Sequence, residues 1–273
     1  MNIITCEKIQ QLANVYIGLD SDFNINPIIK RQSDKHLNIN RITVLYDNPS
    51  IVFCYPDRIE LLSTKIVYFQ NNFTLITCGS DMNFYLTPSV QKIVDCGKLK
   101  KWYCQNLCFE HPSIQFLPIG LANVMYPHGN LTFFTKNYNY NKKYNVYFQF
   151  LIQTNRSKRM RCFNALKNKI RFLPKTDPFT NLCRVALHKF CICPEGNGID
   201  THRFWEALYV KTVPIVLKNP LIDIIIRSTS IPIVVLNNWN ELNINTLDYT
   251  KYDFSSIQET SFEYYSKLIL STD

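Results

Sequence analysis

The residues best suited to chemistry stand in one short segment, residues 189–208, which reads KFCICPEGNGIDTHRFWEAL. Its apolar first part ends at a proline, Gly196 and Gly198 follow, and Asp200 or Thr201 then stands where it can cap a helix by accepting a backbone N–H bond. A helix start presents unpaired N–H groups and a partial positive charge, which suit an anion such as a diphosphate. Glycines let the backbone approach that anion closely. The segment therefore predicts an anion-binding helix start near Thr201.

Two charged side chains stand on the expected helix. Arg203 falls in its first turn and can donate two parallel hydrogen bonds to phosphate oxygens. Glu206 is three residues further on, hence on the same helix face, where a carboxylate can accept from a ribose diol. An ordinary i,i+3 surface pair is the alternative for these two residues. Trp205, between them, is more typical of a core than of a ligand platform.

Strand-like apolar runs alternate with helical stretches along the chain, which predicts an α/β fold with parallel sheets built from strand–helix–strand units. The strand-like runs are Ile42–Tyr46, Ile51–Tyr55, Phe73–Thr77, Ile114–Leu117, Val146–Leu151, Lys189–Cys193, Val213–Leu217 and Ile231–Leu236. The helical stretches include Ser157–Lys169, Thr201–Lys211 and Ser261–Leu270.

A polar, unpatterned stretch over residues 135–143 is interpreted as a linker, with a surface loop inside one domain as the alternative. It predicts two α/β domains over residues 1–140 and 141–273, with a last helix that crosses back to the first domain as an open alternative.

The formal charge of +9 is uneven along the chain. Residues 1–140 carry 12 Lys/Arg against 10 Asp/Glu, whereas residues 141–273 carry 18 against 11. The excess predicts either a solvated basic face or an anionic partner: nucleic acid, an acidic membrane surface or a phosphorylated small ligand. The basic segment lacks any recognisable nucleic-acid motif, so we expect no nucleic-acid partner.

The 10 cysteines lack the paired CxxC spacing of a structural zinc site. Cys191 and Cys193 alternate on an expected strand, so both should face one side of a sheet, while Cys54, Cys78 and Cys183 are typical of buried small apolar residues. No signal peptide and no apolar run of spanning length appear. Together these features predict a cytoplasmic protein without a membrane span.

Residues 189–216 closely resemble the carboxy-terminal signature of exostosin-type glycosyltransferases, especially the short versions encoded by large DNA viruses. That signature is a Ser/Cys-Pro-x-Gly-Asn-Gly-x-Asp-Thr-His-Arg-x-Trp-Glu-Ala run followed by a Pro-Ile-Val strand. The segment also resembles fucosyltransferases, but more weakly. Fucosyltransferases have Thr-Glu-Lys at the place where this chain has Thr201-His202-Arg203. The resemblance implies donor-binding roles for Glu195, Gly196, Asn197, Gly198, Asp200, Thr201, His202, Arg203 and Glu206.

Three further segments fit this family. Asn155 to Arg159 resembles its Asn-x-x-x-Arg element, which implies that Asn155, Lys158 and Arg159 face the diphosphate. Residues 117–130, with Asn123 and His128, resemble its Pro-Ile-Gly-x-Ala-Asn…His-Gly-Asn run and imply acceptor binding. Residues 75–81 resemble its loop that ends in Ser-Asp. The likeness covers about residues 40–245.

The resemblance implies two facing Rossmann-like domains of the GT-B type, with the acceptor held by the first and the nucleotide sugar by the second. It implies an inverting transfer from a UDP-sugar to a glycan hydroxyl. The attacking hydroxyl needs a base within hydrogen-bond reach. Asp81 is our first choice, and Asp57 and His128 are the rivals.

Several alternatives stay open. UDP-xylose is the favoured donor by likeness to the viral relatives, with UDP-glucuronate, UDP-galactose and a GDP-fucose-type transfer as rivals. A non-catalytic module that binds a nucleotide or glycan is the alternative to an enzyme. The pair Asp20 and Asp22 after an apolar run is the pattern with which other transferases hold manganese. The basic donor loop makes such an ion redundant, so we expect no metal cofactor.

Overall fold

The computed structural model describes residues 2–43, 50–134 and 141–271. Contacts between residues divide the chain into two compact units. The amino-terminal unit comprises Asn2–Ile119 and the segment that begins at Ser261, and the carboxy-terminal unit comprises Gly120–Thr260. Most of the expected linker 135–143 and most of the expected strand Ile42–Tyr46 fall in residues 135–140 and 44–49, outside the described residues.

The amino-terminal unit is built on a parallel sheet with the strand order β2-β1-β3-β4-β5-β6 among the described residues. Its strands are β1 (Val15–Gly18), β2 (His36–Asn38), β3 (Ile51–Cys54), β4 (Phe73–Thr77), β5 (Leu99–Cys104) and β6 (Ile114–Phe116). Its α-helices are α1 (Cys6–Gln10), α2 (Pro27–Lys30), α3 (Ile59–Lys65), α4 (Pro88–Val94) and α9 (Phe262–Leu270). Its 3-10 helices are η1 (Asp22–Asn24), η2 (Ser33–Lys35), η3 (Ile39–Arg41), η4 (Pro56–Arg58) and η5 (Ile66–Tyr68).

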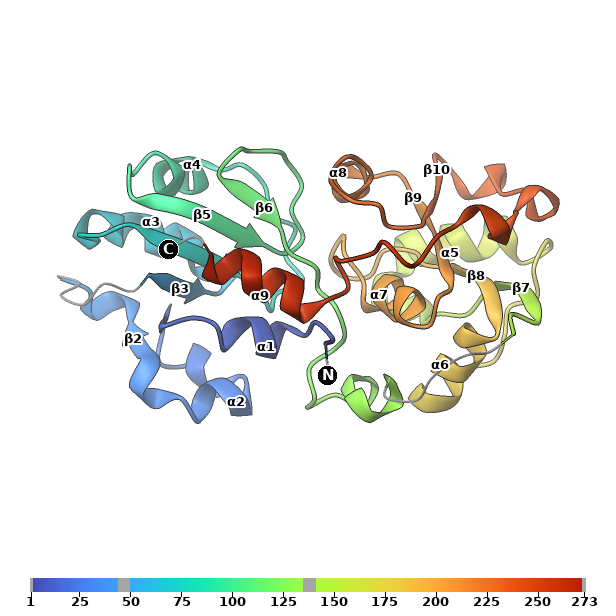
Figure 1. Cartoon of the computed structure of the whole chain (residues 1–273), viewed down its shortest axis with the longest axis horizontal. Coiled ribbons are helices and arrows are strands. Elements are labelled where there is room, and N and C mark those ends of the chain that lie inside the picture. The colour runs from blue at the N-terminus through green and yellow to red at the C-terminus, as the bar shows by residue number, and fades with distance from the viewer. Residues whose placement is uncertain (1, 44–49, 135–140, 272–273) are drawn as a thin grey trace. The chain divides into compact units, whose positions relative to one another are not determined.

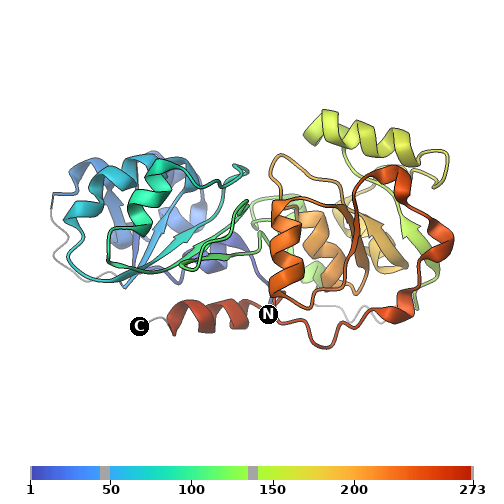
Figure 2. The same cartoon turned by 90° about the horizontal axis from the view of Figure 1, so that it is seen from above.

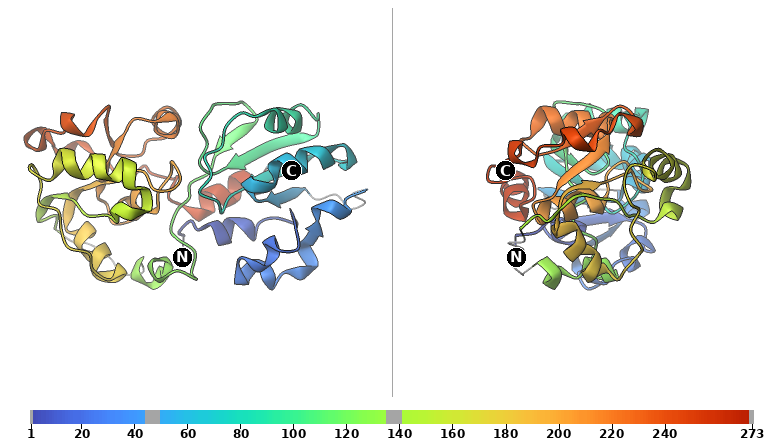
Figure 3. Two further views of the ribbon diagram at one scale, coloured as in Figure 1. Left: turned by 180° about the vertical axis from the view of Figure 1, so that it is seen from behind. Right: turned by 90° about the vertical axis from the view of Figure 1, so that its right-hand side faces the viewer.

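Helices cover both faces of this sheet. In Figure 1, α9 lies on the side toward the viewer, and in the view from behind in Figure 3 (left), α3 lies on the side toward the viewer. Tyr16, Phe53 and Ile76 pack into one core cluster with residues of α1 and α9. Tyr103 donates from its hydroxyl to the Leu268 carbonyl oxygen at 2.9 Å. The carboxy-terminal helix is therefore part of the first unit's core.

The carboxy-terminal unit holds a second parallel sheet, with the strand order β10-β9-β8-β7 among the described residues. Its strands are β7 (Tyr144–Tyr147), β8 (His188–Ile192), β9 (Val213–Leu217) and β10 (Val234–Leu236). Its α-helices are α5 (Arg156–Leu166), α6 (Pro178–Ala186), α7 (His202–Tyr209) and α8 (Pro220–Ser228). Its 3-10 helices are η6 (Pro127–Gly129), η7 (Leu131–Phe134), η8 (Ile152–Asn155), η9 (Trp239–Glu241), η10 (Ile244–Thr246) and η11 (Tyr249–Lys251).

The two faces of this second sheet bury different side chains. Phe190 and Ile192 of β8 join a core cluster with Cys162 and Leu166 of α5. Figure 2 shows α5 apart from α7. Cys191 and Cys193 alternate with them and are also buried. This alternation follows from the period of two along a strand. The expected placement of both cysteines on one face is confirmed.

Local sequence signals explain where several helices begin. The side chains of Thr87, Asp177, Asn219 and Ser261 each accept a backbone N–H bond at the start of a helix, as good N-caps do. Proline occupies the first turn of α4, α6 and α8, where its missing N–H has no cost. These caps place the strand-to-helix turns, and the candidate site is built from such turns.

The α/β fold class with parallel sheets is confirmed, and some boundaries differ from the prediction. The strand expected over Val146–Leu151 is shifted: β7 covers Tyr144–Tyr147, residues 148–151 belong to no strand or helix, and the 3-10 helix η8 begins at Ile152. The strand expected from Ile231 begins only at Val234. Cys54 and Cys78 are buried as expected, while Cys183 is only partly buried. Trp205 is fully buried, which confirms its place in the core.

Candidate functional site

A cavity of about 760 Å³ lies in the carboxy-terminal unit, at the carboxyl ends of β8, β9 and β10. Open parallel sheets bind ligands at this edge, because the loops that leave the strands converge there. Its basic side chains are Lys158 and Arg161 of α5 and Lys218 after β9. The other polar lining residues are Asn164, Glu195, Asp200, Thr201, Asn219, Asn237, Asn238 and Asn240. Trp239, Ile222 and Ile225 are among the apolar ones.

The turn from β8 into α7 borders this cavity. Thr201 is the N-cap residue of α7, yet its side chain makes no capping hydrogen bond. Asp200 accepts instead from the Thr201 N–H at 2.8 Å and from the indole Nε1 of Trp205 at 2.9 Å. Thr201 is therefore the N-cap by position, as expected, whereas the side chain that accepts a backbone N–H bond at this turn is that of Asp200. The buried Trp205 draws the Asp200 carboxylate inward, which fixes the turn from its core side.

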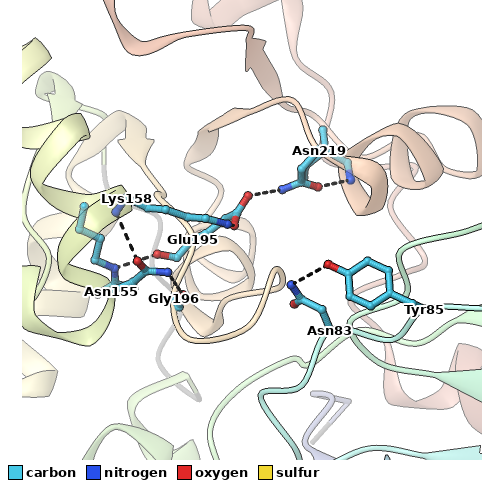
Figure 4. A network of polar contacts seen from close by, with 9 residues as sticks. Asn83, Tyr85, Asn155, Lys158, Glu195, Gly196 and Asn219 are labelled. Atoms are coloured by element: carbon cyan, nitrogen blue, oxygen red, sulfur yellow. Dashed lines mark hydrogen bonds and ion pairs between the residues drawn. The ribbon is translucent and has the colours of Figure 1, made fainter.

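A network of polar contacts holds the Glu195–Gly196 loop on its other side (Figure 4). Lys158 Nζ forms an ion pair with Glu195 Oε2, and Asn219 Nδ2 donates to Glu195 Oε1 at 3.0 Å. Asn155, the N-cap of α5, donates from Nδ2 to the Gly196 carbonyl oxygen at 2.7 Å. The loop is thus tied both to the start of α5 and to the start of α8.

Arg159 is a buried clamp behind the same loop. Its Nε donates to the Glu195 carbonyl oxygen at 2.9 Å and its Nη1 to the Leu151 carbonyl oxygen at 2.8 Å. Burial, with a smaller contribution from the positive charge of Arg203, lowers the pKa of Arg159 to about 10. The side chain therefore remains charged at neutral pH while it joins two loops.

Arg203 and Glu206 form a partly buried pair on α7. Arg203 Nε lies 2.9 Å from Glu206 Oε2, and the two side chains are 19% and 12% exposed. Arg203 Nη1 donates to the Gln149 carbonyl oxygen at 3.0 Å, and its guanidinium lies over the Tyr147 ring. Burial disfavours the charge, but the Glu206 carboxylate together with Cys191, Tyr147 and Cys193 outweighs burial and raises the pKa of Arg203 above its usual range. The pair is therefore an internal one and not the surface pair that was the alternative.

His128 lies beside this pair within the carboxy-terminal unit. Its ring centre is 6.0 Å from that of His202, whose Nδ1 meets the Gly120 carbonyl oxygen at 2.9 Å. Partial burial lowers the pKa of His128, the Glu206 charge opposes this shift, and His202 and Arg203 reinforce it. His128 is thus mainly neutral at pH 7, the form that accepts a proton.

The loop that carries His128 is packed tightly at a glycine. A Cβ atom on Gly129 would stand 2.0 Å from the Asn123 carbonyl oxygen. Asn123, an expected acceptor residue, is half-buried, and its carbonyl oxygen also accepts from the Tyr126 N–H at 3.0 Å. Asn123 thus fixes the backbone that presents His128.

The other two candidate bases belong to the amino-terminal unit. Asp57 follows β3, and Asp81 stands in the loop after β4. Because β3 and β4 are parallel neighbours, both residues lie at the same edge of the sheet. Both are exposed. In the loop of Asp81, Asn83 Nδ2 lies 3.5 Å from the Tyr85 hydroxyl (Figure 4).

The two acids of the possible manganese motif bind different arginines. Asp22 accepts from Arg58 Nε at 2.8 Å and Nη2 at 2.7 Å, and from the Leu19 N–H. Asp20 is exposed and lies 3.7 Å from Arg41. Burial works against ionisation of Asp22, but Arg58 and the Leu19 N–H lower its pKa overall. The Asp22 carboxylate therefore serves as a structural anchor of its loop.

Within the described residues, no group of three or more His, Cys, Asp or Glu side chains is arranged to hold a metal ion. In the same part of the chain, no helix has the length and apolar character needed to cross a bilayer.

Ten of the twelve residues predicted for donor binding fall into three sets. Lys158, Glu195, Asp200 and Thr201 line the cavity. Asn155, Arg159 and Gly196 hold the loop beside it, while His202, Arg203 and Glu206 form the internal cluster with His128. Of the remaining two, Asn197 is exposed and Gly198 is buried.

Several cavity residues were not predicted from the sequence. These are Lys218, Asn219, Asn237 and Asn238, which follow β9 and β10, and Arg161 of α5. For the four residues after β9 and β10, the available signal was their position directly after expected strands, although these strands do not lead into the glycine-containing motif at residues 194–203.

Comparison with protein-family models finds none that matches the chain, and comparison with curated proteins finds no match either.

Proposed function

We propose that the protein is an inverting glycosyltransferase of the GT-B type, which uses a UDP-sugar and needs no metal ion. The observation that carries the proposal is the basic cavity at the carboxyl edge of the second sheet. Its volume of about 760 Å³ lies within the range of small-molecule sites. Lys158, Arg161 and Lys218 supply positive charge to it. An anionic ligand of nucleotide size fits these properties.

In this proposal the diphosphate lies against the start of α7 and the three basic side chains. The leaving group gains negative charge in the transition state, so fixed donors at this place lower the barrier. Glu195, held by Lys158 and Asn219, faces the same cavity and is placed to accept from hydroxyls of the donor.

Arg203 and Glu206 act differently from the sequence-based expectation. Because Arg203 already donates to Glu206 and to the Gln149 carbonyl oxygen, we assign both residues a positioning role. They fix the first turns of α7 and lie beside His128. Arg159 has the same kind of role for the Glu195–Gly196 loop.

The proposed reaction is a single displacement at the anomeric carbon. An acceptor hydroxyl attacks as the bond to UDP breaks, and a protein base takes the hydroxyl proton. Asp81 is the first candidate, since its carboxylate is exposed at the edge of the first sheet. Asp57 shares that edge, and His128 has the neutral imidazole that a base requires.

Binding is tested first, by calorimetry of the full chain with UDP in the presence of EDTA. Replacement of Lys158 by Met removes a charge-assisted contact worth about 1.5–3 kcal/mol, so the affinity should fall by about tenfold or more. Lys100→Met, at an exposed position of β5, is the matched control and should leave the affinity unchanged. Equal affinities in both variants would remove the cavity from the proposal.

Transfer is tested by UDP release from UDP-xylose, UDP-glucuronate and UDP-galactose, with GDP-fucose as the rival donor. Asp81→Asn should lower the rate about 100-fold or more, the usual contribution of a general base, while UDP affinity stays the same. Asp57→Asn and His128→Gln identify the base if Asp81 is not it, and Asp34→Asn is the exposed control. UDP binding without release from any donor would support a binding module instead of an enzyme.

A further inference from the structure

Two buried cysteines from distant parts of the chain meet in the amino-terminal unit, and the glycosyl-transfer proposal uses neither. Cys6 is the first residue of α1, and Cys78 follows β4 directly. Their Sγ atoms lie 2.6 Å apart, although the residues are 72 positions apart in sequence. The contact joins a short helix to the end of a central strand.

The surroundings hold both thiols in place. Cys6 and Cys78 belong to one core cluster with Ile9, Tyr55 and Ile76, and they are 4% and 0% exposed. Cys6 Sγ also lies only 3.2 Å from the place where a Cβ on Gly79 would stand. Gly79 itself has φ +87°, a conformation that favours glycine, so the backbone turns sharply just after Cys78.

We propose that Cys6 and Cys78 are a site of covalent modification, the partners of an intramolecular disulfide. An S–S bond measures about 2.03–2.05 Å, so only a small movement of two side chains separates contact from bond. Both sulfurs belong to one compact unit and already lie in contact with each other. Cys191 of β8 and Cys193 just after it are also close, but they are only two residues apart in sequence and connect no distant parts of the chain.

The oxidant in this step is a small-molecule disulfide such as oxidised glutathione. The thiolate of one cysteine attacks it, which forms a mixed disulfide and releases one equivalent of glutathione. The second cysteine then attacks the mixed disulfide, the Cys6–Cys78 bond forms, and a second glutathione leaves. Two protein thiols are oxidised, one glutathione disulfide is reduced, and the two thiol protons end on the two glutathione molecules.

Burial controls the rate of this step. The Cys78 thiol has a pKa well above its usual value, because burial disfavours the thiolate and the neighbouring Cys6 reinforces that effect. Since the thiolate is the attacking species, the folded chain should react slowly, and a chain that is still folding should react faster. A bond that forms in this way joins α1 to the loop that carries Asp81.

Trypsin provides a direct test, because each cysteine falls in a peptide with no other cysteine. Residues 1–8 contain Cys6 alone, and residues 66–92 contain Cys78 alone. The full chain is incubated in mixtures of oxidised and reduced glutathione, once folded and once during refolding from urea. Free thiols are then alkylated, and the non-reduced digest is analysed by mass spectrometry. We expect the peptides 1–8 and 66–92 to be joined to each other, with a mass lower by two hydrogens.

Two variants make the outcome unambiguous. Cys78→Ser should abolish the joined peptide and leave Cys6 alkylated, whereas Cys96→Ser, at a half-buried cysteine elsewhere, should leave the joined peptide unchanged. The proposal is wrong if both cysteines are alkylated in both arms under excess oxidised glutathione. It is equally wrong if Cys78 is joined mainly to another cysteine, for example Cys104.

Discussion

At the residue scale, the Arg203–Glu206 pair connects a sequence motif to the stability of the fold. Both side chains are mostly buried, and the guanidinium also binds the Gln149 carbonyl oxygen. A buried pair is a weak source of net stability, but loss of one partner leaves the other charge without compensation. The two motif residues therefore contribute to the packing of the fold, whatever ligand the site binds.

Replacement of Glu206 by Gln should destabilise the carboxy-terminal unit. Breaking a buried pair costs about 3–5 kcal/mol, and the partial exposure here reduces the expected cost to about 2 kcal/mol. Hydrogen exchange of the α7 amides measures it in the intact chain. Glu263→Gln is the control, since Glu263 and Lys267 form an exposed i,i+4 pair in α9, and exposed pairs contribute little to stability. Equal effects of the two substitutions would contradict the internal role.

The titration of His128 is the second prediction at this scale. Its pKa should lie below 6.5, since partial burial and the charges of His202 and Arg203 disfavour the imidazolium. Glu206→Gln removes the one neighbouring charge that favours protonation, so the pKa of His128 should fall further in that variant. NMR titration with assignment by His128→Gln measures both values. A pKa that rises in Glu206→Gln would refute the assigned environment.

The same shift has a consequence for stability with a definite sign. In the unfolded chain His128 takes up its proton near pH 6.5, whereas in the folded chain it does so at lower pH. Its contribution to folding is therefore complete above pH 6.5 and is lost as the pH falls from there toward the folded pKa. His188, whose pKa is also lowered by burial, acts in the same direction.

At the element scale, the loop before η6 depends on a glycine for a steric reason. Gly129 does not have positive φ, but its Cβ position is occupied by backbone atoms of Asn123 and Ala122. Gly129→Ala should therefore shift the loop and cost about 2–3 kcal/mol, as overpacking does. Gly97→Ala is a matched control: its Cβ would meet nothing within 4 Å, and φ +73° alone costs about 1 kcal/mol.

Urea unfolding of both glycine variants measures the difference, and the His128 resonances report the local movement. Gly129→Ala should change the His128 titration, and Gly97→Ala should not. If Gly129→Ala proves as mild as Gly97→Ala, the backbone contact in the Asn123–Gly129 loop is looser than the structure has it.

The elements that the sequence predicted best are buried strands between clear turn signals. The expected bounds of β4 and β9 agree with the structure, because every residue of β4 and nearly all of β9 are buried and apolar or β-branched. The strand β5 was not predicted, since lysines fill its first half and only Trp102, Tyr103 and Cys104 are buried. The edge strand β2 has three half-buried residues and no apolar run to reveal it.

The candidate site was predicted where its residues lie in short segments with a clear local signal, namely Glu195 to Thr201 and the segment that carries Lys158. The turn from Glu195 to Thr201 carries glycines and a cap signal, so the local sequence points to it. Lys218 and Asn237 enter the same cavity because β9 and β10 are neighbours of β8, and this is a property of strand order. The internal use of Arg203 also escaped prediction, since its partner Gln149 lies 54 positions away.

At the scale of the whole molecule, the two units have different charge and different assigned tasks. The sequence excess of positive charge falls in residues 141–273, where 18 Lys/Arg stand against 11 Asp/Glu. The basic residues of the cavity belong to this part, while the exposed acids Asp57 and Asp81 belong to the amino-terminal unit. Nucleotide binding should therefore be a property of the carboxy-terminal unit alone.

Hydrogen exchange of the intact chain with and without UDP tests this division. A ligand that binds only the folded state at 100 times its Kd stabilises that state by about 2.7 kcal/mol. Protection should therefore rise at the amino ends of α7 and α8 and in α5, and it should not change in β3 and β4 of the amino-terminal unit. The result should be the same in EDTA and in manganese, because the three basic side chains take the place of an ion. If protection appears only with manganese, or appears first around Asp20 and Asp22, the charged cavity is not the donor site and the paired acids are.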